Sequence, residues 1–517
     1  MRLIYIILLS GLVVFFSCRQ PSVESFDILI ENGQVFLGDS TAARSVSIGI
    51  RGDTIAWIGN HKNVTATLRI DASGLIVAPG FIDPHTHTLE DLLDTADRAN
   101  LPFLMQGVTT VVTGNDGGGP RDIAGTFSRF EAGGIGTNAA LYIGHGTIRS
   151  LVMGAADRIP TEEELSKMKE MVRAGMEAGA LGLSTGLYYA PGSFSKTEEV
   201  IELSKVAAAH GGIYDSHIRD ESSYNIGLLG AIGEVVQIAR EAKISAHIAH
   251  IKALGTDVWG KSREVVEMVE NARKEGLDIT ADQYPYLASG TSVEAALLPR
   301  WVMTDSRKAY LQRLSDPSLL PRIKEETREN LRRRGGAATI LITETKDSAL
   351  LGKNLAEIAA ERNADPVEVA LDIARKGGAG VASFNMNPDD LTYFMKQPWV
   401  MTGSDGSGGH PRKYGTFPLK YREFVREKGL LTPAEFICKS SGQVAETLGI
   451  EKRGFLRMGY FADIVIFDPE TFTDKADFSH PRQLAEGIQY LLVNGTPAIV
   501  EGNYTGVLPG RPIRKAK

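Results

Sequence analysis

The chain has 517 residues, enough for a barrel domain together with smaller units. Hydrophobic residues make up 43% and charged residues 23% of it, as in ordinary globular proteins, so extensive disorder and a coiled coil are excluded. The 55 glycines and 22 prolines follow no period, which excludes a fibrous repeat. The net charge is −7 with both signs mixed along the chain, so there is no basic footprint and we expect no nucleic-acid partner.

The N-terminus has the pattern of a secretory signal. An apolar run over Leu3–Phe16 is too short to span a bilayer and ends just before Cys18. This resembles a bacterial lipoprotein signal, which implies removal of residues 1–17, lipidation of Cys18 and membrane attachment through that lipid on the periplasmic side of the cell envelope. The alternatives are plain secretion to the periplasm and an uncleaved anchor. Cys438 is the one further cysteine and has no partner for an internal disulfide.

Short strands are predicted at both ends of the chain. At the N-terminal end they are Phe26–Ile30, Val46–Ile50 and Thr54–Ile58, separated by Gly, Asn and Asp. At the C-terminal end Ala462–Phe467 and Ile488–Val493 have the same character. Two β-rich ends therefore flank a long middle.

The middle alternates predicted strands and helices. Capping boxes at Thr161–Glu164 and Ser195–Glu198 open two of the helices. Alternating β and α predicts a parallel sheet, and eight strands indicate a closed (β/α)₈ barrel over residues 79–452. The last gap is too long for one connection, so we expect an insertion within about 295–395. The predicted strands are Phe81–His87, Val108–Thr113, Ala139–Ile143, Ala180–Ser184, Gly212–His217, Ile244–Ile251, Asp278–Ala281 and Trp399–Gly403.

Residues that suit metal chemistry lie at the ends of these strands. His85 and His87 are two apart in the first strand, so both imidazoles point to the same side, inside the barrel mouth. Other strands end in polar ligand types, which is the active-site pattern of a barrel. These further residues are Asp116, His217, His250 and Asp405.

With these residues the chain resembles the amidohydrolase superfamily, specifically its D-aminoacylase and N-acyl-D-amino-acid deacylase group. The resemblance implies a (β/α)₈ barrel with a small β-sandwich built from both ends, here 24–78 and 453–517. It also implies one or two zinc ions and release of a D-amino acid from a small N-acyl substrate. It extends over about Asp27–Pro512 and is carried by Pro79–His87, Gly107–Asp116, Gly144–Thr147, Gly182–Leu187, Tyr214–Glu221, Asp282–Tyr286 and Gly403–Gly406.

The resemblance also implies roles for single residues. His85 and His87 match ligands of a loosely held metal, and His217 and His250 match ligands of a tightly held zinc. Asp405 matches the carboxylate that handles protons. Residues that match the contacts of the substrate carboxylate are Lys252, Tyr284, Arg412 and, next to the family's serine position, Ser289. His145, in Gly144-His145-Gly146 at the barrel mouth, is interpreted from its position as a support of the site or a substrate contact.

Asp116 departs from the resemblance, because the family usually has a bridging Cys at this place. A carboxylate is anionic like a thiolate and its two oxygens can bridge, but it is less selective for zinc over other divalent ions. A carboxylated lysine is excluded as the bridge, since Ala180–Leu187 contains no Lys. The alternative is that Asp116 is only a turn residue in the Gly-rich loop Gly114–Gly117.

Three other functions stay open. Dipeptidase or cyclic-amide hydrolysis would use the same residues. Gly255–Ser262 matches the P-loop pattern, which would indicate a nucleotide hydrolase, although Trp259 crowds that loop. A non-catalytic binding protein of the amidohydrolase type would be expected to have lost ligands, which this chain retains.

Overall fold

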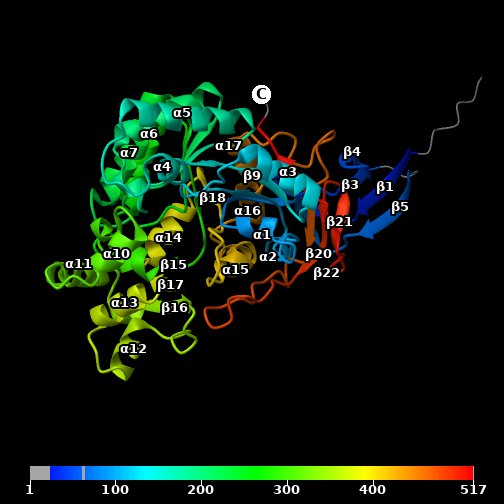
Figure 1. Cartoon of the computed structure of the whole chain (residues 1–517). Coiled ribbons are helices and arrows are strands. Elements are labelled where there is room, and N and C mark those ends of the chain that lie inside the picture. Colours follow the sequence, from blue (N-terminus) through cyan, green and yellow to red (C-terminus); the bar gives the residue numbers. More distant parts are fainter. Residues whose placement is uncertain (1–23, 61–63, 516–517) are drawn as a thin grey trace, which may run out of the picture.

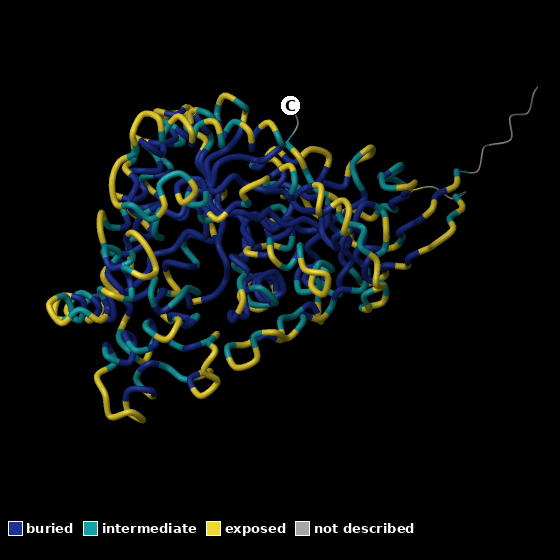
Figure 2. Tube along the Cα trace, viewed as in Figure 1, coloured by how far each residue is buried: buried dark blue, intermediate teal, exposed yellow. Residues whose placement is uncertain are grey.

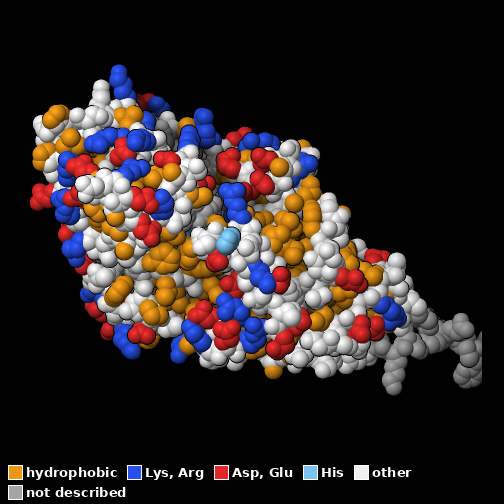
Figure 3. Space-filling view, turned by 90° about the horizontal axis from the view of Figure 1, so that it is seen from below, with side chains coloured by type: hydrophobic (Ala, Val, Ile, Leu, Met, Phe, Trp, Pro, Cys, Tyr) orange, Lys and Arg blue, Asp and Glu red, His pale blue; other side chains and the backbone are white. Residues whose placement is uncertain are grey.

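The computed structural model describes residues 24–60 and 64–515 (Figure 1). The predicted signal segment 1–17 and Cys18 lie outside these residues. Within the described ranges, no helix is long and apolar enough to cross a membrane. Acidic and basic side chains are interspersed over the face shown in Figure 3.

A parallel barrel forms the centre of the molecule, which confirms the predicted fold. Its strands pair in two arcs that meet around Tyr142, between β9 and β10. A parallel bridge between Thr86 and Gly406 closes the barrel at its mouth. The strands are β7 (Phe81–Thr86), β8 (Val108–Thr113), β9 (Asn138–Leu141), β10 (Ile143–Gly144), β11 (Gly182–Gly186), β12 (Ile213–His217), β13 (Ala246–Ile248), β14 (Ile279–Gln283) and β18 (Val400–Thr402).

Amphipathic helices cover the barrel, and most of their buried faces join the strands in one large hydrophobic core, while the last helix packs on strand residues in a smaller second core (Figure 2). The predicted capping box at Thr161 and Glu164 is present at the start of α5. The one predicted at Ser195 is wrong, because its hydroxyl donates to the Gly192 carbonyl and α6 begins at Thr197 without a side-chain cap. The helices are α1 (Leu89–Leu93), α2 (Leu101–Leu104), α3 (Ile123–Gly133), α4 (His145–Met153), α5 (Glu162–Glu177), α6 (Thr197–Ala209), α7 (Gly227–Ala242), α8 (Ser262–Lys274), α14 (Pro388–Met395), α15 (Arg412–Leu419) with its π-helical continuation Lys420–Glu427, α16 (Pro433–Ser440) and α17 (Gly442–Leu448).

Two sheets form the β domain, at the right of Figure 1, and strands from both chain ends contribute to it. N-terminal β6 (Ile76–Pro79) pairs antiparallel with C-terminal β19 (Ile464–Phe467). The last strand, β23 (Pro512–Ile513), instead pairs with β9 of the barrel. The other strands are β1 (Glu24–Glu31), β3 (Ser47–Arg51), β4 (Thr54–Gly59) and β5 (Val64–Asp71) in one sheet, and β2 (Gln34–Val35), β20 (Ile488–Val493), β21 (Thr496–Val500) and β22 (Asn503–Tyr504) in the other.

A lobe inserted between β14 and β18 has a hydrophobic core of its own, green to yellow at the lower left of Figure 1. Its antiparallel sheet has the order β15-β17-β16, and β15 starts at Ala288, somewhat before the predicted insertion. The elements are β15 (Ala288–Ser292), α9 (Val293–Leu297), α10 (Arg307–Arg313), α11 (Leu320–Arg333), β16 (Ile340–Glu344), α12 (Leu355–Glu361), α13 (Pro366–Arg375) and β17 (Gly380–Phe384).

Two buried lysines anchor β18, the strand that leads to Asp405. Lys439 of α16 donates to the carbonyl of Val400 at 2.8 Å, and Lys420 donates to the Thr402 hydroxyl at 3.0 Å. Burial lowers the pKa of Lys439 to about 8 and that of Lys420 well below its usual range. Buried amines that donate to a strand fix its position, so the last strand of the barrel is held rigidly behind the mouth.

Candidate active site

Six polar side chains converge at the C-terminal mouth of the barrel. His85 lies on β7 and His87 follows its last residue, Asp116 follows β8, and His217 ends β12. The remaining two, His250 and Asp405, follow β13 and β18. The structure therefore brings together every residue that the sequence suggested for metal binding and proton transfer.

Three of these residues have a left-handed backbone, which side chains other than glycine rarely adopt. The φ angles are 55° at Asp116, 37° at His250 and 49° at Asp405. Such a conformation costs on the order of 1–3 kcal/mol and persists where surrounding contacts impose it, commonly at functional sites. At Asp116 the backbone lies against β11: a Cβ placed on Gly186 would be 2.3 Å from the Asp116 carbonyl oxygen. Gly186 therefore lets the loop approach the strand.

The Asp116 carboxylate lies among the four imidazoles. Its Oδ1 is 3.4 Å from His85 Nε2 and 3.5 Å from His250 Nε2. Its Oδ2 is 3.5 Å from both His87 Nε2 and His217 Nδ1. Each oxygen thus faces one histidine of each sequence pair, so the carboxylate is within reach of all four imidazoles and is placed to act as a metal ligand.

These separations fit a divalent cation better than direct hydrogen bonds. They exceed the usual N···O hydrogen-bond length, whereas ligand bonds of ~2.0–2.2 Å at tetrahedral angles place neighbouring donor atoms about 3.3–3.5 Å apart. Both ring nitrogens of His85 and of His217 are buried without a hydrogen-bond partner among the described residues. Ligand atoms of His85, Asp116, His250 and Asp405 all lie within 4.8 Å of one another. The donor chemistry and the spacing both fit zinc.

The electrostatics differ among the four histidines. Burial opposes the charge on His87 and His250, but Asp116 and Asp405 outweigh it and raise the pKa of His87 to about 9 and that of His250 well above its ordinary value. Burial lowers the pKa of His85 to about 4 despite Asp116 and Asp405, so the ring is neutral at pH 7 and its lone pair is available. Burial opposes the charge on Asp405, but Arg412 and His250 outweigh it and hold the pKa of that carboxyl well below its ordinary value. Asp405 is therefore a carboxylate, 3.0 Å from His87 Nε2 and 2.7 Å from Arg412 Nη1.

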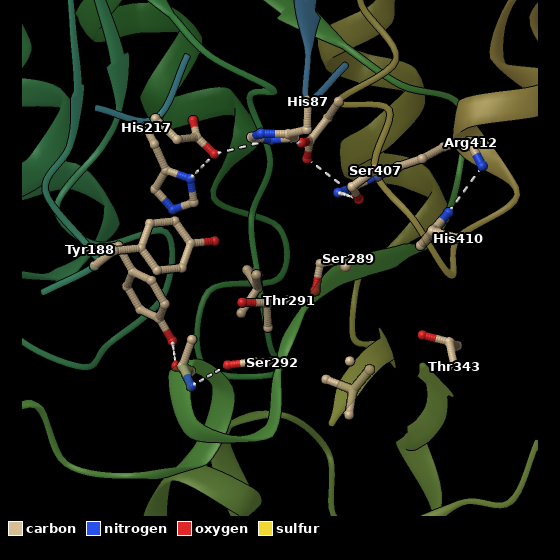
Figure 4. A pocket seen from close by; sticks show the side chains of 18 of the residues that line it. His87, Tyr188, His217, Ser289, Thr291, Ser292, Thr343, Ser407, His410 and Arg412 are labelled. Atoms are coloured by element: carbon tan, nitrogen blue, oxygen red, sulfur yellow. Dashed lines mark hydrogen bonds and ion pairs between the residues drawn. The ribbon is translucent and has the colours of Figure 1, made fainter. Parts of the chain in front are cut away.

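A cavity of about 530 Å³ opens in front of this cluster, between the barrel mouth and the inserted lobe. In Figure 4, His87 and His217 lie along its upper edge and Tyr188 lies on one flank. Ser289 and Thr291 of β15 face them from the lobe. The lobe thus supplies one wall of the site, so it shapes what can bind there.

Three of the predicted substrate contacts line this cavity, and two do not. Lys252, Ser289 and Arg412 are in its lining. Tyr284 packs behind two of them, with its ring 5.7 Å from the Lys252 ammonium and 4.9 Å from the Arg412 guanidinium. His145 lies outside the lining, where its Nε2 is 2.8 Å from Glu199. Tyr284 therefore supports the two cations, and His145 belongs to a neighbouring polar cluster.

The P-loop pattern has no free anion site. The amides of Gly260 and Ser262, which would cradle a phosphate, donate instead to the two carboxylate oxygens of Asp390, at 2.7 and 3.2 Å. Trp259 donates its indole N–H to the Asn385 carbonyl, which fixes the turn against the lobe connection. The protein's own carboxylate thus fills the place of the phosphate, and the nucleotide alternative is wrong.

The sequence did not assign several residues of the cavity. Tyr188 and Tyr189 pack their rings on His217, with centroids 5.6 and 4.7 Å apart. Glu221 lies at the back of the histidines, and Arg334 reaches the lining from the lobe. The spacing of Glu221, four residues after His217, was a usable signal. No motif marks Arg334, since its place depends on how the lobe folds.

The barrel presents four imidazoles and the Asp116 carboxylate at its mouth, with the charged Asp405 carboxylate beside them. This fold and this site define a metal-dependent hydrolase. The chain belongs to the amidohydrolase family, whose model matches residues 69–499.

Its curated relatives include a D-aminoacylase of Alcaligenes xylosoxydans xylosoxydans, 35% identical over 96% of this chain and 99% of that protein. An N-acyl-D-glutamate deacylase of the same organism is 32% identical over 95% and 97% of the two chains.

Solved structures match over the same extent. A D-aminoacylase structure described as having a binuclear metal centre has a TM-score of 0.82 at 31% identity, over 95% of this chain and all of that chain. An N-acyl-D-glutamate deacylase from Bordetella bronchiseptica, complexed with zinc and a phosphonate mimic of the tetrahedral intermediate, has a TM-score of 0.81 at 30% identity, over the same shares. A D-hydantoinase, at 15% identity and a TM-score of 0.57, shares the fold.

Proposed function

We propose that the protein hydrolyses the amide bond of N-acyl-D-amino acids, releasing a D-amino acid and a carboxylate. The observation that carries this proposal is the position of Asp405, whose carboxylate lies between the histidine cluster and Arg412. Arg412 and Lys252 line the same cavity and suit a substrate that bears a carboxylate. The D preference is taken from the relatives named D-aminoacylase and N-acyl-D-glutamate deacylase.

Different side chains of the site have different roles in the proposed reaction. A divalent ion held by Asp116 and the four histidines would supply Lewis acidity toward the scissile carbonyl and acidify water. Asp405 accepts the proton of the attacking water on Oδ1 and passes it to the leaving nitrogen. Arg412 holds the other oxygen of Asp405 and fixes the carboxylate in place. Lys252 and Arg412 orient the substrate through its carboxylate.

A substrate screen tests the proposal. We expect turnover of N-acetyl-D-amino acids and little of their L forms, of dipeptides or of a cyclic amide such as a hydantoin. Metal analysis of the same sample accompanies the screen. Preferred turnover of the cyclic amide would replace the linear-amide assignment by the hydantoinase type of chemistry.

Replacing Arg412 or Lys252 by alanine should raise the KM of carboxylate substrates more than the KM of their primary amides. A charge-assisted hydrogen bond contributes ~1.5–3 kcal/mol, so Arg412→Ala or Lys252→Ala should raise KM at least about tenfold for an N-acetyl-D-amino acid. The KM for its primary amide should change much less. Arg375→Ala is the matched control, since that guanidinium donates to the Leu314 carbonyl within the lobe and lies outside the cavity lining. Equal effects on acid and amide would contradict a carboxylate clamp.

We also propose that Cys18 carries a lipid that attaches the enzyme to the periplasmic side of the envelope. The support is the sequence pattern, in which the apolar run Leu3–Phe16 ends just before this cysteine. A Cys18→Ser chain should lose lipoprotein processing and leave the membrane fraction. If it still fractionates with membranes as the wild type does, the lipid is not the anchor.

A further inference from the structure

Glu221 is a buried carboxylate that the reaction above does not use. It lies in the loop after β12, four residues beyond His217, and is 5% exposed. Its side chain lines the cavity from behind, on the far side of His217 and His250 from Asp116. A buried charge in this position needs partners, and the partners identify its role.

The two histidines face Asp116 with one nitrogen each and face Glu221 with the other. His250 directs Nε2 at Asp116 (3.5 Å) and Nδ1 at Glu221 Oε1 (3.2 Å). His217 directs Nδ1 at Asp116 (3.5 Å) and Nε2 at Glu221 Oε2 (3.8 Å). Each carboxylate oxygen of Glu221 therefore faces one imidazole ring on the side away from Asp116.

The same carboxylate also holds the substrate-facing ammonium. Lys252 donates to Glu221 Oε1 at 2.5 Å and to the His250 carbonyl at 2.9 Å. Lys252 Nζ is also only 2.8 Å from His250 Nδ1. If His250 carries its hydrogen on Nδ1, the Nε2 lone pair is free toward Asp116. In that case His250 Nδ1 and the Lys252 ammonium are two donors that face each other. Glu221 Oε1 lies close to both donors, and its negative charge offsets their repulsion.

We propose that Glu221 is a positioning residue that couples the metal centre to the carboxylate clamp. It fixes the ring orientation of His250 and, at longer range, of His217, and it holds Lys252 at the cavity wall. Outer partners of metal-ligating histidines contribute in this way, and their loss typically costs 10–100-fold in metal affinity. The part that concerns the substrate rests on the proposed function, and the part that concerns the metal does not.

The test compares wild type, Glu221→Gln and the control Glu234→Gln. Glu234 is equally buried at 6% exposure, pairs with Arg219 and lies outside the cavity lining. The first measurement is zinc affinity by chelator competition on the purified protein, without substrate. We expect Glu221→Gln to weaken zinc binding about 10–100-fold and the control to leave it within about twofold.

The second measurement uses zinc-saturated protein and compares KM for an N-acetyl-D-amino acid with KM for its primary amide. In Glu221→Gln the ratio of the amide KM to the acid KM should fall about tenfold, because Lys252 is no longer held in place. Unchanged zinc affinity would overturn the first role, and an unchanged acid preference would overturn the second. If the wild type accepts no N-acyl-D-amino acid, the proposed function fails while the zinc measurement still decides the first role.

A variant that keeps the charge guards against simple misfolding. Glu221→Asp retains a carboxylate with shorter reach, so it should bind zinc more tightly than Glu221→Gln. The same zinc affinity in both variants, with thermal unfolding lowered equally, would indicate a merely structural residue and overturn the proposal.

Discussion

Asp405→Asn should fold, retain its bound metal and lose most of its turnover. A general acid–base group contributes typically 10²–10⁴-fold, so kcat/KM for the best N-acyl-D-amino acid should fall by about that range. The amide keeps the size of the side chain and the contact with Arg412, but it cannot accept a proton. Steady-state kinetics and metal analysis of the same sample check this expectation.

The control for Asp405 is Asp390→Asn, which also removes a buried carboxylate charge. Asp390 is 3% exposed and accepts from Gly260 and Ser262, away from the cavity lining. Its loss should lower thermal stability and leave kcat/KM nearly unchanged. Near-normal turnover by Asp405→Asn with a full complement of metal would show that another group moves the proton.

The barrel and the residues that suit metal binding could be predicted because the sequence patterns that indicate them are local. Histidines two apart in one strand must face the same side, and parallel strands in a barrel end at the same mouth. From His85 and His87 at one strand end, the convergence with His217 and His250 followed without any knowledge of contacts. A local motif can still fail, as at Ser195, whose hydroxyl donates to the Gly192 carbonyl three residues earlier and does not cap the following helix.

The cavity wall could not be predicted in the same way. The lobe between β14 and β18 places Thr291, Thr343 and Arg334 against the mouth through its own core packing, which no short motif encodes. Tyr284 illustrates a second limit. The resemblance implied a substrate contact for it, yet its ring packs behind Lys252 and Arg412, outside the cavity lining. Sequence spacing identifies neighbours, whereas side-chain direction depends on packing.

Asp116 carries the other large expected effect, because its carboxylate lies 3.4–3.5 Å from a ring nitrogen of each of the four histidines. If it bridges two ions, Asp116→Ala should lose metal and activity together, with zinc affinity lowered by more than about 100-fold, the upper range for losing a mere outer partner. Asp116→Asn keeps the shape without the charge and should bind metal poorly as well, since buried cationic charge would lack its nearest anion.

Asp116→Cys makes the expectation specific to the chemistry of the donor. A thiolate is softer than a carboxylate, so this variant should keep zinc while it binds manganese or cobalt less well than the wild type. Asp122→Asn is the control, because Asp122 caps α3 through the Gly125 amide and Asn caps a helix equally well. Metal analysis decides between the two interpretations of this loop. Full occupancy and near-normal turnover in Asp116→Ala would make Asp116 a turn residue after all. The four imidazoles would then hold the ions with Asp405 as their nearest carboxylate, and the 3.4–3.5 Å separations around Asp116 would reflect packing alone.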